Sequence, residues 1–244
     1  MSTTVKASAL VEPPSELHEL VPHGHQVDLA TGLAFVNTLE YERGLPVDHL
    51  DSYVTALRWF REHDLLHAGM LEAELARDAA DPEGGERTLA RIRRVRTAMR
   101  ELTDAAVEGR TPAQRDLDEI NRALRTHYTY YLIPARDGVS LDHKHEGDPI
   151  AGALARLTES VASEVSGGHP EQLRVCANED CRWVFNDSSR TGRRKWCDMA
   201  TCGNRAKVAR HREKKRVEEE AAVSSVGRTW KRILTGARRG DPDA

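Results

Sequence analysis

Hydrophobic and polar positions alternate with the period of an α-helix through most of the chain before residue 169. The pattern is clearest over residues 86–109, where apolar side chains recur every three or four positions and Gly109 follows at a place where helices commonly stop. These apolar positions are Leu89, Ile92, Val95, Met99, Leu102 and Ala106. The sequence therefore predicts one long helix with a single apolar stripe that faces a core.

The same period predicts several shorter helices. Their expected ranges are 27–43, 47–66, 69–80, 111–124 and 148–168. Local signals set their ends: Gly44 stops the first helix, and Asp48 suits the N-cap position of the second. Thr111 followed by Pro112 has the residue order that favours a helix start, so it opens the helix over 111–124.

One segment departs from the helical period. In residues 127–143, HYTYYLIPARDGVSLDH, two β-prone runs flank the turn-forming residues PARDG. This pattern predicts a hairpin, which we expect to be the only substantial sheet element of the large domain. Further on, Gly167 and Gly168 are followed by Pro170, a combination that indicates a domain boundary.

Charge divides the chain more sharply than hydrophobicity does. Residues 174–216 contain 13 Lys or Arg against 5 Asp or Glu, whereas residues 1–173 contain 18 against 29. The formal charges are therefore +8 and −11, although that of the whole chain is only −3. Such asymmetry predicts a polyanion partner for the basic segment. No apolar run suits a membrane span or a signal peptide, so we expect a cytoplasmic protein without membrane contact.

All four cysteines lie in this basic segment, as two pairs with four residues inside each pair and 15 residues between the pairs. The candidate metal ligands are Cys176, Cys181, Cys197 and Cys202. Four thiolates form a closed tetrahedral site for zinc (Zn²⁺), with no open position for a catalytic water. In a reducing cytoplasm, clustered thiols favour metal over disulfides. Two other interpretations stay open: four incidental thiols, and a redox switch that uses the same sulfurs.

These patterns predict a mostly α fold of the α+β class. A helical N-terminal domain with a small β-hairpin is followed by a small four-cysteine zinc-finger domain. The expected units are a flexible tail over 1–24, the helical domain over 25–168, the finger over 174–216, and a tail over 217–244 that is first helical and then flexible.

Basic side chains surround the cysteines, four of them in the loop between the pairs and six on a predicted helix after the second pair. These candidate nucleic-acid contacts are Arg190, Arg193, Arg194, Lys195, Arg205, Lys207, Arg210, Arg212, Lys214 and Lys215. Phosphate is their natural counter-charge, so duplex DNA is the leading partner. RNA, an acidic protein surface and the acidic N-terminal domain of the same chain stay open as alternatives. Since a single finger with a short helix reads few base pairs, we expect a homodimer.

The run of residues 176–207 resembles the CGNR zinc fingers of bacterial proteins, which are named for the tetrapeptide that stands here at residues 202–205. The other matching positions are Phe185, Asp187, Ser189, Arg190, Arg193, Arg194, Trp196 and Lys207. The chain before the finger resembles the ABATE domain that usually accompanies it. Its FVNT motif stands at residues 35–38, and the long helix, the INRAL segment and the hairpin follow in the expected order.

The resemblance implies a stress-response transcription regulator with an N-terminal sensing or dimerising domain and a C-terminal DNA-binding finger. Asn37 and Thr38 are candidate contacts for an unknown small-molecule effector in the sensing domain. The alternative is that both hydrogen-bond to neighbouring backbone. Because the sequence contains no nucleophile elbow, phosphate loop or open metal triad, we expect no enzymatic activity.

Overall fold

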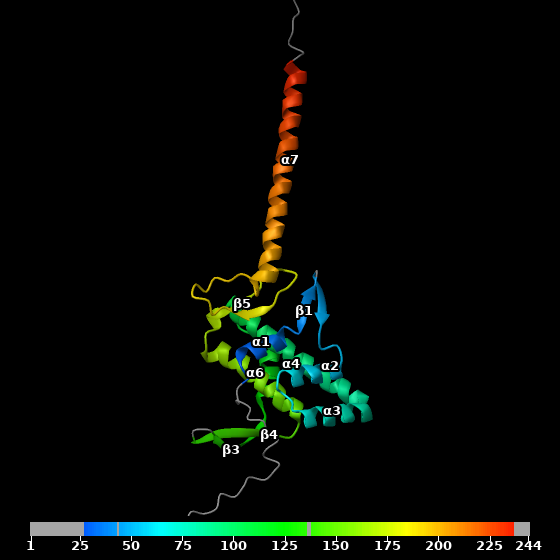
Figure 1. Ribbon diagram of the computed structural model, residues 1–244, viewed down its shortest axis with the longest axis vertical. Helices are drawn as coiled ribbons and strands as arrows, with labels where there is room; N and C mark the ends of the chain where they lie inside the picture. Colours follow the sequence, from blue (N-terminus) through cyan, green and yellow to red (C-terminus); the bar gives the residue numbers. More distant parts are fainter. Residues whose placement is uncertain (1–26, 43, 136–137, 237–244) are drawn as a thin grey trace, which may run out of the picture.

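The computed structural model describes residues 27–42, 44–135 and 138–236 (Figure 1). The predicted flexible tail over 1–24 lies outside the described residues, as do residues 237–244. The described chain is mostly helical with small β-hairpins, which confirms the predicted fold class. Its α-helices are α1 (Leu29–Val36), α2 (Tyr53–Glu62), α3 (Ala68–Ala80), α4 (Pro82–Glu108), α5 (Gln114–Leu124), α6 (Pro149–Gly167) and α7 (Asn204–Gly236).

Helix α4 is the central element, and the five other helices before the finger pack against it or against one another. It ends as predicted, at Gly109, whose φ of 66° lies in the left-handed region that glycine adopts without strain. It begins earlier than predicted, at Pro82 rather than at residue 86. The Asp81 carboxylate caps it by accepting a hydrogen bond from the Gly84 N–H at 2.9 Å. The Asp-Pro pair that ends α3 therefore also starts α4.

The prediction of a helix over residues 27–43 is wrong in its second half. Helix α1 stops at Val36, and strands β1 (Leu39–Glu42) and β2 (Leu45–Asp48) form an antiparallel hairpin instead. Gly44, with a φ of 79°, lies in the turn of this hairpin rather than at a helix end. Since each strand has only four residues and Leu45 is 70% exposed, turn geometry rather than a strong apolar pattern defines the hairpin. The hairpin over 127–143 is thus not the only one in this region.

Two predicted helix starts also need correction. Helix α2 begins at Tyr53 with Ser52 as N-cap, and Ser52 forms a capping box with Thr55. Asp48 lies before this start, at the end of β2, where its carboxylate accepts hydrogen bonds from a buried arginine of α4. Helix α5 begins at Gln114, three residues after Thr111, and its N-cap makes no side-chain hydrogen bond.

The other sheet elements are two further antiparallel hairpins. Strands β3 (His127–Ala135) and β4 (Gly138–Glu146) confirm the predicted hairpin and extend it, and they project from the helical body (Figure 1). Strands β5 (Leu173–Val175) and β6 (Val184–Asn186) lie in the cysteine segment. A short 3₁₀ helix, η2 (Pro170–Gln172), precedes β5, and a π-helical turn, η3 (Met199–Gly203), leads into α7.

One hydrophobic core joins the helices to the cysteine segment. Its members on α1, α2, α4 and α6 include Phe35, Phe60 and Met99, which are fully buried. Leu173 of β5 and Val184 of β6 belong to the same cluster and are at most 1% exposed. The finger therefore packs against the helical part and is not joined to it by a linker alone. Within the described residues, no helix combines the length and hydrophobicity that crossing a membrane requires.

Helix α7 leaves this body and extends away from it along the long axis of the molecule (Figure 1). It has 33 residues and is therefore about 50 Å long at roughly 1.5 Å per residue. Its first three turns carry six of the ten candidate nucleic-acid contacts, those from Arg205 to Lys215. The helix continues past residue 216 as far as Gly236.

Candidate metal centre and nucleic-acid interface

The four cysteines come together at the base of α7. Cys176 follows β5, Cys181 lies in the turn before β6, Cys197 precedes η3, and Cys202 lies within η3. Their Sγ atoms all lie within 4.8 Å of one another. The Cys181–Cys197 separation is 3.7 Å and the Cys197–Cys202 separation is 3.9 Å. Tetrahedral Zn–S bonds of about 2.3 Å require sulfurs about 3.8 Å apart, so these residues fit one ion.

The acid–base state of the thiols also favours a bound cation. Burial raises the pKa of Cys181 to about 11, and burial together with the neighbouring sulfurs raises the pKa of Cys197 further. Several thiolates cannot lie side by side in a partly buried site without a positive ion between them. A divalent cation supplies that charge and displaces the protons, so metal binding and proton release are coupled here. At Cys202 burial is outweighed by hydrogen bonds from Asn178 and the neighbouring sulfurs, which lower its pKa. The geometry of the cluster suits a metal ion.

Backbone hydrogen bonds prepare the two cysteine turns. The Cys176 N–H donates to the Trp183 carbonyl, and the Ala177 N–H donates to the Lys195 carbonyl, each at 2.8 Å. The side-chain amide of Asn178 donates to the Cys202 Sγ at 3.5 Å. This contact orients a sulfur and tempers its negative charge, as outer-sphere partners do in metal sites.

The middle residues of the CGNR tetrapeptide have distinct roles. A Cβ on Gly203 would lie 2.9 Å from the Met199 Sδ and 3.4 Å from the Trp196 ring, so this glycine makes room for close packing. Asn204 donates its side-chain amide to the Ala200 carbonyl at 2.9 Å and so ties the first turn of α7 back to η3.

Asn37 fastens the finger to the helical part. Its side-chain oxygen accepts from the Val184 N–H at 2.9 Å, and its side-chain amide donates to the Val184 carbonyl at 2.8 Å. Asn37 is only 6% exposed, so both bonds are shielded from water. A second contact lies at the rim, where the Trp183 Nε1–H donates to the Glu40 carboxylate at 3.1 Å. The amide of Asn37 thus completes the free edge of β6 as a neighbouring strand would.

Thr38 is also engaged with protein groups. Its hydroxyl donates to the Phe35 carbonyl at 2.7 Å and accepts from the Arg96 Nη1 at 3.0 Å. Both residues of this candidate effector pair therefore direct their hydrogen bonds to the protein. Their role as ligand contacts stays a prediction.

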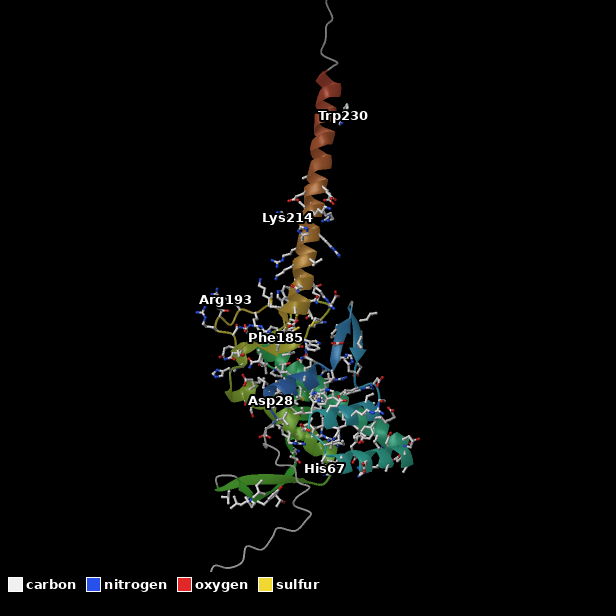
Figure 2. All side chains as sticks on the ribbon, in the orientation of Figure 1. Asp28, His67, Phe185, Arg193, Lys214 and Trp230 are labelled. Atoms are coloured by element: carbon white, nitrogen blue, oxygen red, sulfur yellow. The ribbon has the colours of Figure 1, made fainter. Side chains whose placement is uncertain are left out.

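The ten candidate nucleic-acid contacts are all exposed. Four lie in the loop between β6 and η3, and six lie on the first turns of α7; Figure 2 labels Arg193 and Lys214 among them. Lys214 and Lys215 form ion pairs with Glu218 and Glu219, one turn further along α7. The other eight have no ion-pair partner among the residues that the structure describes. None of these ten residues forms an ion pair with a described carboxylate of the helical part. This disfavours the alternative in which the acidic N-terminal domain is the partner of the basic segment.

Asp187 shapes the basic loop. Its side chain is 1% exposed, and it accepts hydrogen bonds from the Ser189 N–H at 3.2 Å and the Arg194 N–H at 2.8 Å. The side-chain hydrogen bond from Ser189 and the backbone N–H donors lower the pKa of Asp187, so it stays ionised at neutral pH. One carboxylate thereby closes the turn that carries Arg190 and Arg193. Arg194 packs over the Phe185 ring at 5.2 Å from its centroid.

Sequence reasoning did not find the contacts that support this site. It named Asp187 only as a position of the CGNR pattern and Asn37 only as a candidate effector contact, and it did not single out Asn178. Asp187 carried one detectable signal, because Asp followed two residues later by Ser is a common turn-forming pair. Asn37 and Val184 are 147 residues apart, and no local signal connects them.

A metal-centred finger, packed on a helical bundle and continued by a basic helix, defines this chain as a zinc-finger protein. Comparison with known families agrees: the CGNR zinc finger matches residues 172–215. The ABATE family, described as "Putative stress-induced transcription regulator", matches residues 29–168. The chain belongs to the ABATE family and carries a CGNR zinc finger after that domain, in the order the sequence indicated. No curated protein matches it.

Proposed function

We propose that this protein is a DNA-binding transcription regulator whose four cysteines hold zinc and whose basic loop and α7 contact duplex DNA. The observation that carries the proposal is that ten basic side chains are exposed in the loop before η3 and on the first turns of α7, on either side of the cysteine cluster. Most of them have no carboxylate partner among the described residues. Since clustered thiols hold metal in a reducing compartment, we also propose that the protein acts in the cytoplasm.

The dimensions of α7 suit a DNA groove. An α-helix is about 10–12 Å across with its side chains, and the major groove of B-DNA is about 12 Å wide. The six basic residues of α7 lie within Arg205–Lys215, a stretch of about 16 Å at roughly 1.5 Å per residue. In this proposal the loop cations contact phosphates, and Arg205 and Arg210, near the start of α7, contact base edges.

Zinc contributes a closed cross-link between the two cysteine pairs. The residues of the chain do the rest. Asp187 fixes the loop, Asn204 ties η3 to α7, and Asn37 holds β6 against the helical part. These contacts keep the loop cations and the α7 cations in one orientation, so less conformational entropy is lost when DNA binds.

We also propose a homodimer, because one finger contacts only a short site and two copies double the length that is read. Beyond the basic turns, α7 carries half-exposed apolar side chains such as Val217 and Trp230. Sedimentation equilibrium of the zinc-loaded full chain at micromolar concentration measures the assembly directly. A strictly monomeric mass in the presence of duplex DNA would remove the dimer from the proposal.

The test of DNA binding is fluorescence anisotropy of a labelled random-sequence duplex with the zinc-loaded full chain at several salt concentrations. We expect a steep fall in affinity with salt, and replacing Arg205 and Lys207 with Gln should lower the slope of log K against log salt by about 2, or about 1 for each phosphate contact. Replacing the exposed Arg58 and Arg115 of the helical part with Gln is the matched control. Equal slopes in the two double variants would show that α7 is not the DNA contact.

The same assay separates the other partner classes. Preferential competition by single-stranded or structured RNA would assign the basic surface to RNA. Absence of binding to any nucleic acid at low salt would leave an acidic protein partner and overturn the proposal.

A further inference from the structure

A small cavity lies where the helical part meets the finger. It has a volume of about 170 Å³ and is bounded by α4, by the β1 hairpin and by the turn between Cys181 and β6. Val36 and Leu39 line one side of it with apolar surface. Arg96, Arg100 and Asp104 of α4 line another.

Arg96 forms a fixed part of the cavity wall. The residue is 3% exposed, and its two terminal nitrogens donate to the Asp48 carboxylate at 2.6 and 2.8 Å. Asp48 therefore pairs the charge of Arg96 and holds its side chain against the cavity.

Two further arginines add unused donors to the same cavity. Arg100 uses its Nε to bind both oxygens of Asp104 at 2.9 Å, and no described group accepts from its two terminal nitrogens. Arg182 comes from the finger and lies over the Tyr41 ring, 5.1 Å from the centroid, without a carboxylate partner among the described residues. Asp48 pairs with Arg96 and Asp104 pairs with Arg100, so Arg182 gives the site one positive charge without a described carboxylate partner.

Arg182 holds an unusual backbone conformation. Its φ is 58°, in the left-handed region that side chains other than those of glycine and asparagine rarely adopt. The Arg182 N–H donates to the Asn178 carbonyl at 3.0 Å, so the cysteine turn enforces this conformation. As a result, the residue directly after a metal ligand presents its side chain to the cavity. Strained residues of this kind cluster at binding sites.

We propose that the cavity binds a small monocarboxylate with a compact apolar body. The carboxylate accepts from Arg100 and Arg182, and the body packs on Val36 and Leu39. The volume sets the size, because a protein cavity of about 150 Å³ accommodates one benzene ring. Benzoate is therefore close to the upper limit, and a nucleotide does not fit.

The two binding arginines belong to different parts of the molecule. Arg100 lies on α4, and Arg182 lies between the ligand Cys181 and Trp183 of the finger. A carboxylate that bridges them adds a link between helical part and finger beside the one made by Asn37. If the finger binds DNA as proposed above, the bound carboxylate holds the finger in one orientation relative to the helical part and so changes its affinity for DNA. The cavity is then the effector site.

The test is isothermal titration calorimetry of the zinc-loaded full chain with sodium benzoate, with benzamide as the neutral probe of the same shape. We expect benzoate to bind and benzamide to bind at least tenfold more weakly. Arg100→Met and Arg182→Gln should each weaken benzoate at least tenfold, whereas Arg94→Gln, an exposed arginine on another face of α4, should leave it unchanged. Equal binding in all three variants, or no benzoate binding at millimolar concentration, would overturn the proposal.

Two additional readouts separate this site from the proposed function. The rate at which a chromogenic chelator removes zinc should fall when benzoate is present, and this fall should disappear in Arg182→Gln. Neither calorimetry nor zinc release involves DNA, so a failure of DNA binding leaves both results interpretable. A chelation rate that benzoate leaves unchanged in the wild-type chain would contradict a bridge to the finger.

Discussion

The amide of Asn37 offers the most direct test of how the finger is held. In Asn37→Ala, the Val184 N–H and carbonyl lose their partners at 2.9 and 2.8 Å. Both groups lie in a buried environment, since Val184 is 1% exposed and Asn37 is 6% exposed. The substitution therefore leaves two backbone groups unsatisfied while it removes little apolar surface.

The size of the effect follows from those two groups. An unsatisfied buried donor or acceptor costs about 1–3 kcal/mol, so we expect the loss of two partners to lower the free energy of unfolding by about 2–6 kcal/mol. A domain of this kind has about 5–15 kcal/mol in total. The loss should concentrate on the finger, because β6 loses the only side-chain amide that pairs with its edge among the described contacts.

Urea unfolding of the zinc-loaded chain, followed by circular dichroism, measures the free energy, and amide hydrogen exchange locates the loss. Exchange at Val184 should accelerate far more than exchange in α4. Asn121→Ala, at an exposed position of α5, is the control and should change stability by less than about 0.5 kcal/mol. Asn37→Asp keeps the acceptor for the Val184 N–H but places a second acceptor against the carbonyl, so it should be destabilised at neutral pH and partly recover when acid protonates the new carboxyl.

A fall of less than about 0.5 kcal/mol in Asn37→Ala would refute the reasoning, because it would mean that water replaces both bonds at no cost. A large fall with uniform acceleration of exchange across α4 and β6 would also count against it. That pattern would assign Asn37 to the stability of the helical bundle as a whole.

Three further predictions concern the metal, one ion pair and one helix end. Cys197→Ser, or chelation of the wild-type chain, should abolish zinc binding and expose residues 176–203 to protease while the helices persist; a protease pattern that chelation leaves unchanged would contradict this. Burial raises the pKa of Asp48, but the hydrogen bonds from Arg96 and the Leu50 N–H together with the charges of Arg96 and Arg93 outweigh burial and lower that pKa. The contribution of Asp48 to stability is therefore full above about pH 4 and is lost as pH falls through the lower folded-state pKa. Urea midpoints of wild type and Asp48→Asn should accordingly differ at pH 6 and converge towards pH 2, and a constant difference would exclude the ion pair as the cause. Gly109→Ala should cost about 1–2 kcal/mol in thermal unfolding because of its φ of 66° alone, since no atom lies within 4 Å of the added methyl group; an unchanged melting temperature would contradict the strain.

Local signals predicted much of the fold. The stripe on α4, its end at Gly109 and the hairpin over 127–143 follow from neighbours within a few residues, and the structure has all three. The β1–β2 hairpin did not emerge, because Leu39 continues the apolar spacing of α1 and Gly44 suits a helix stop as well as a hairpin turn. Asp48 was misread for a related reason: its partner is Arg96, 48 residues further along the chain.

The metal site was predictable because its chemistry is confined to four residues of one type within a short segment. The surroundings of the site were not. The pairing of Asn37 with β6 and the position of Arg182 over Tyr41 depend on how two distant segments pack. Periodicity and spacing carry information about single elements, whereas such contacts are defined only once the elements have assembled.

The core that β5 and β6 share with the helices limits how the two parts can be recombined. A finger cut out at residue 172 would expose Leu173 and Val184 to water and leave the edge of β6 unpaired. A transplanted finger would meet the same penalty on any host that lacks an amide at the position of Asn37. A finger can therefore be exchanged only onto a helical domain that matches it across this contact, so protein engineering should move the two segments as a pair.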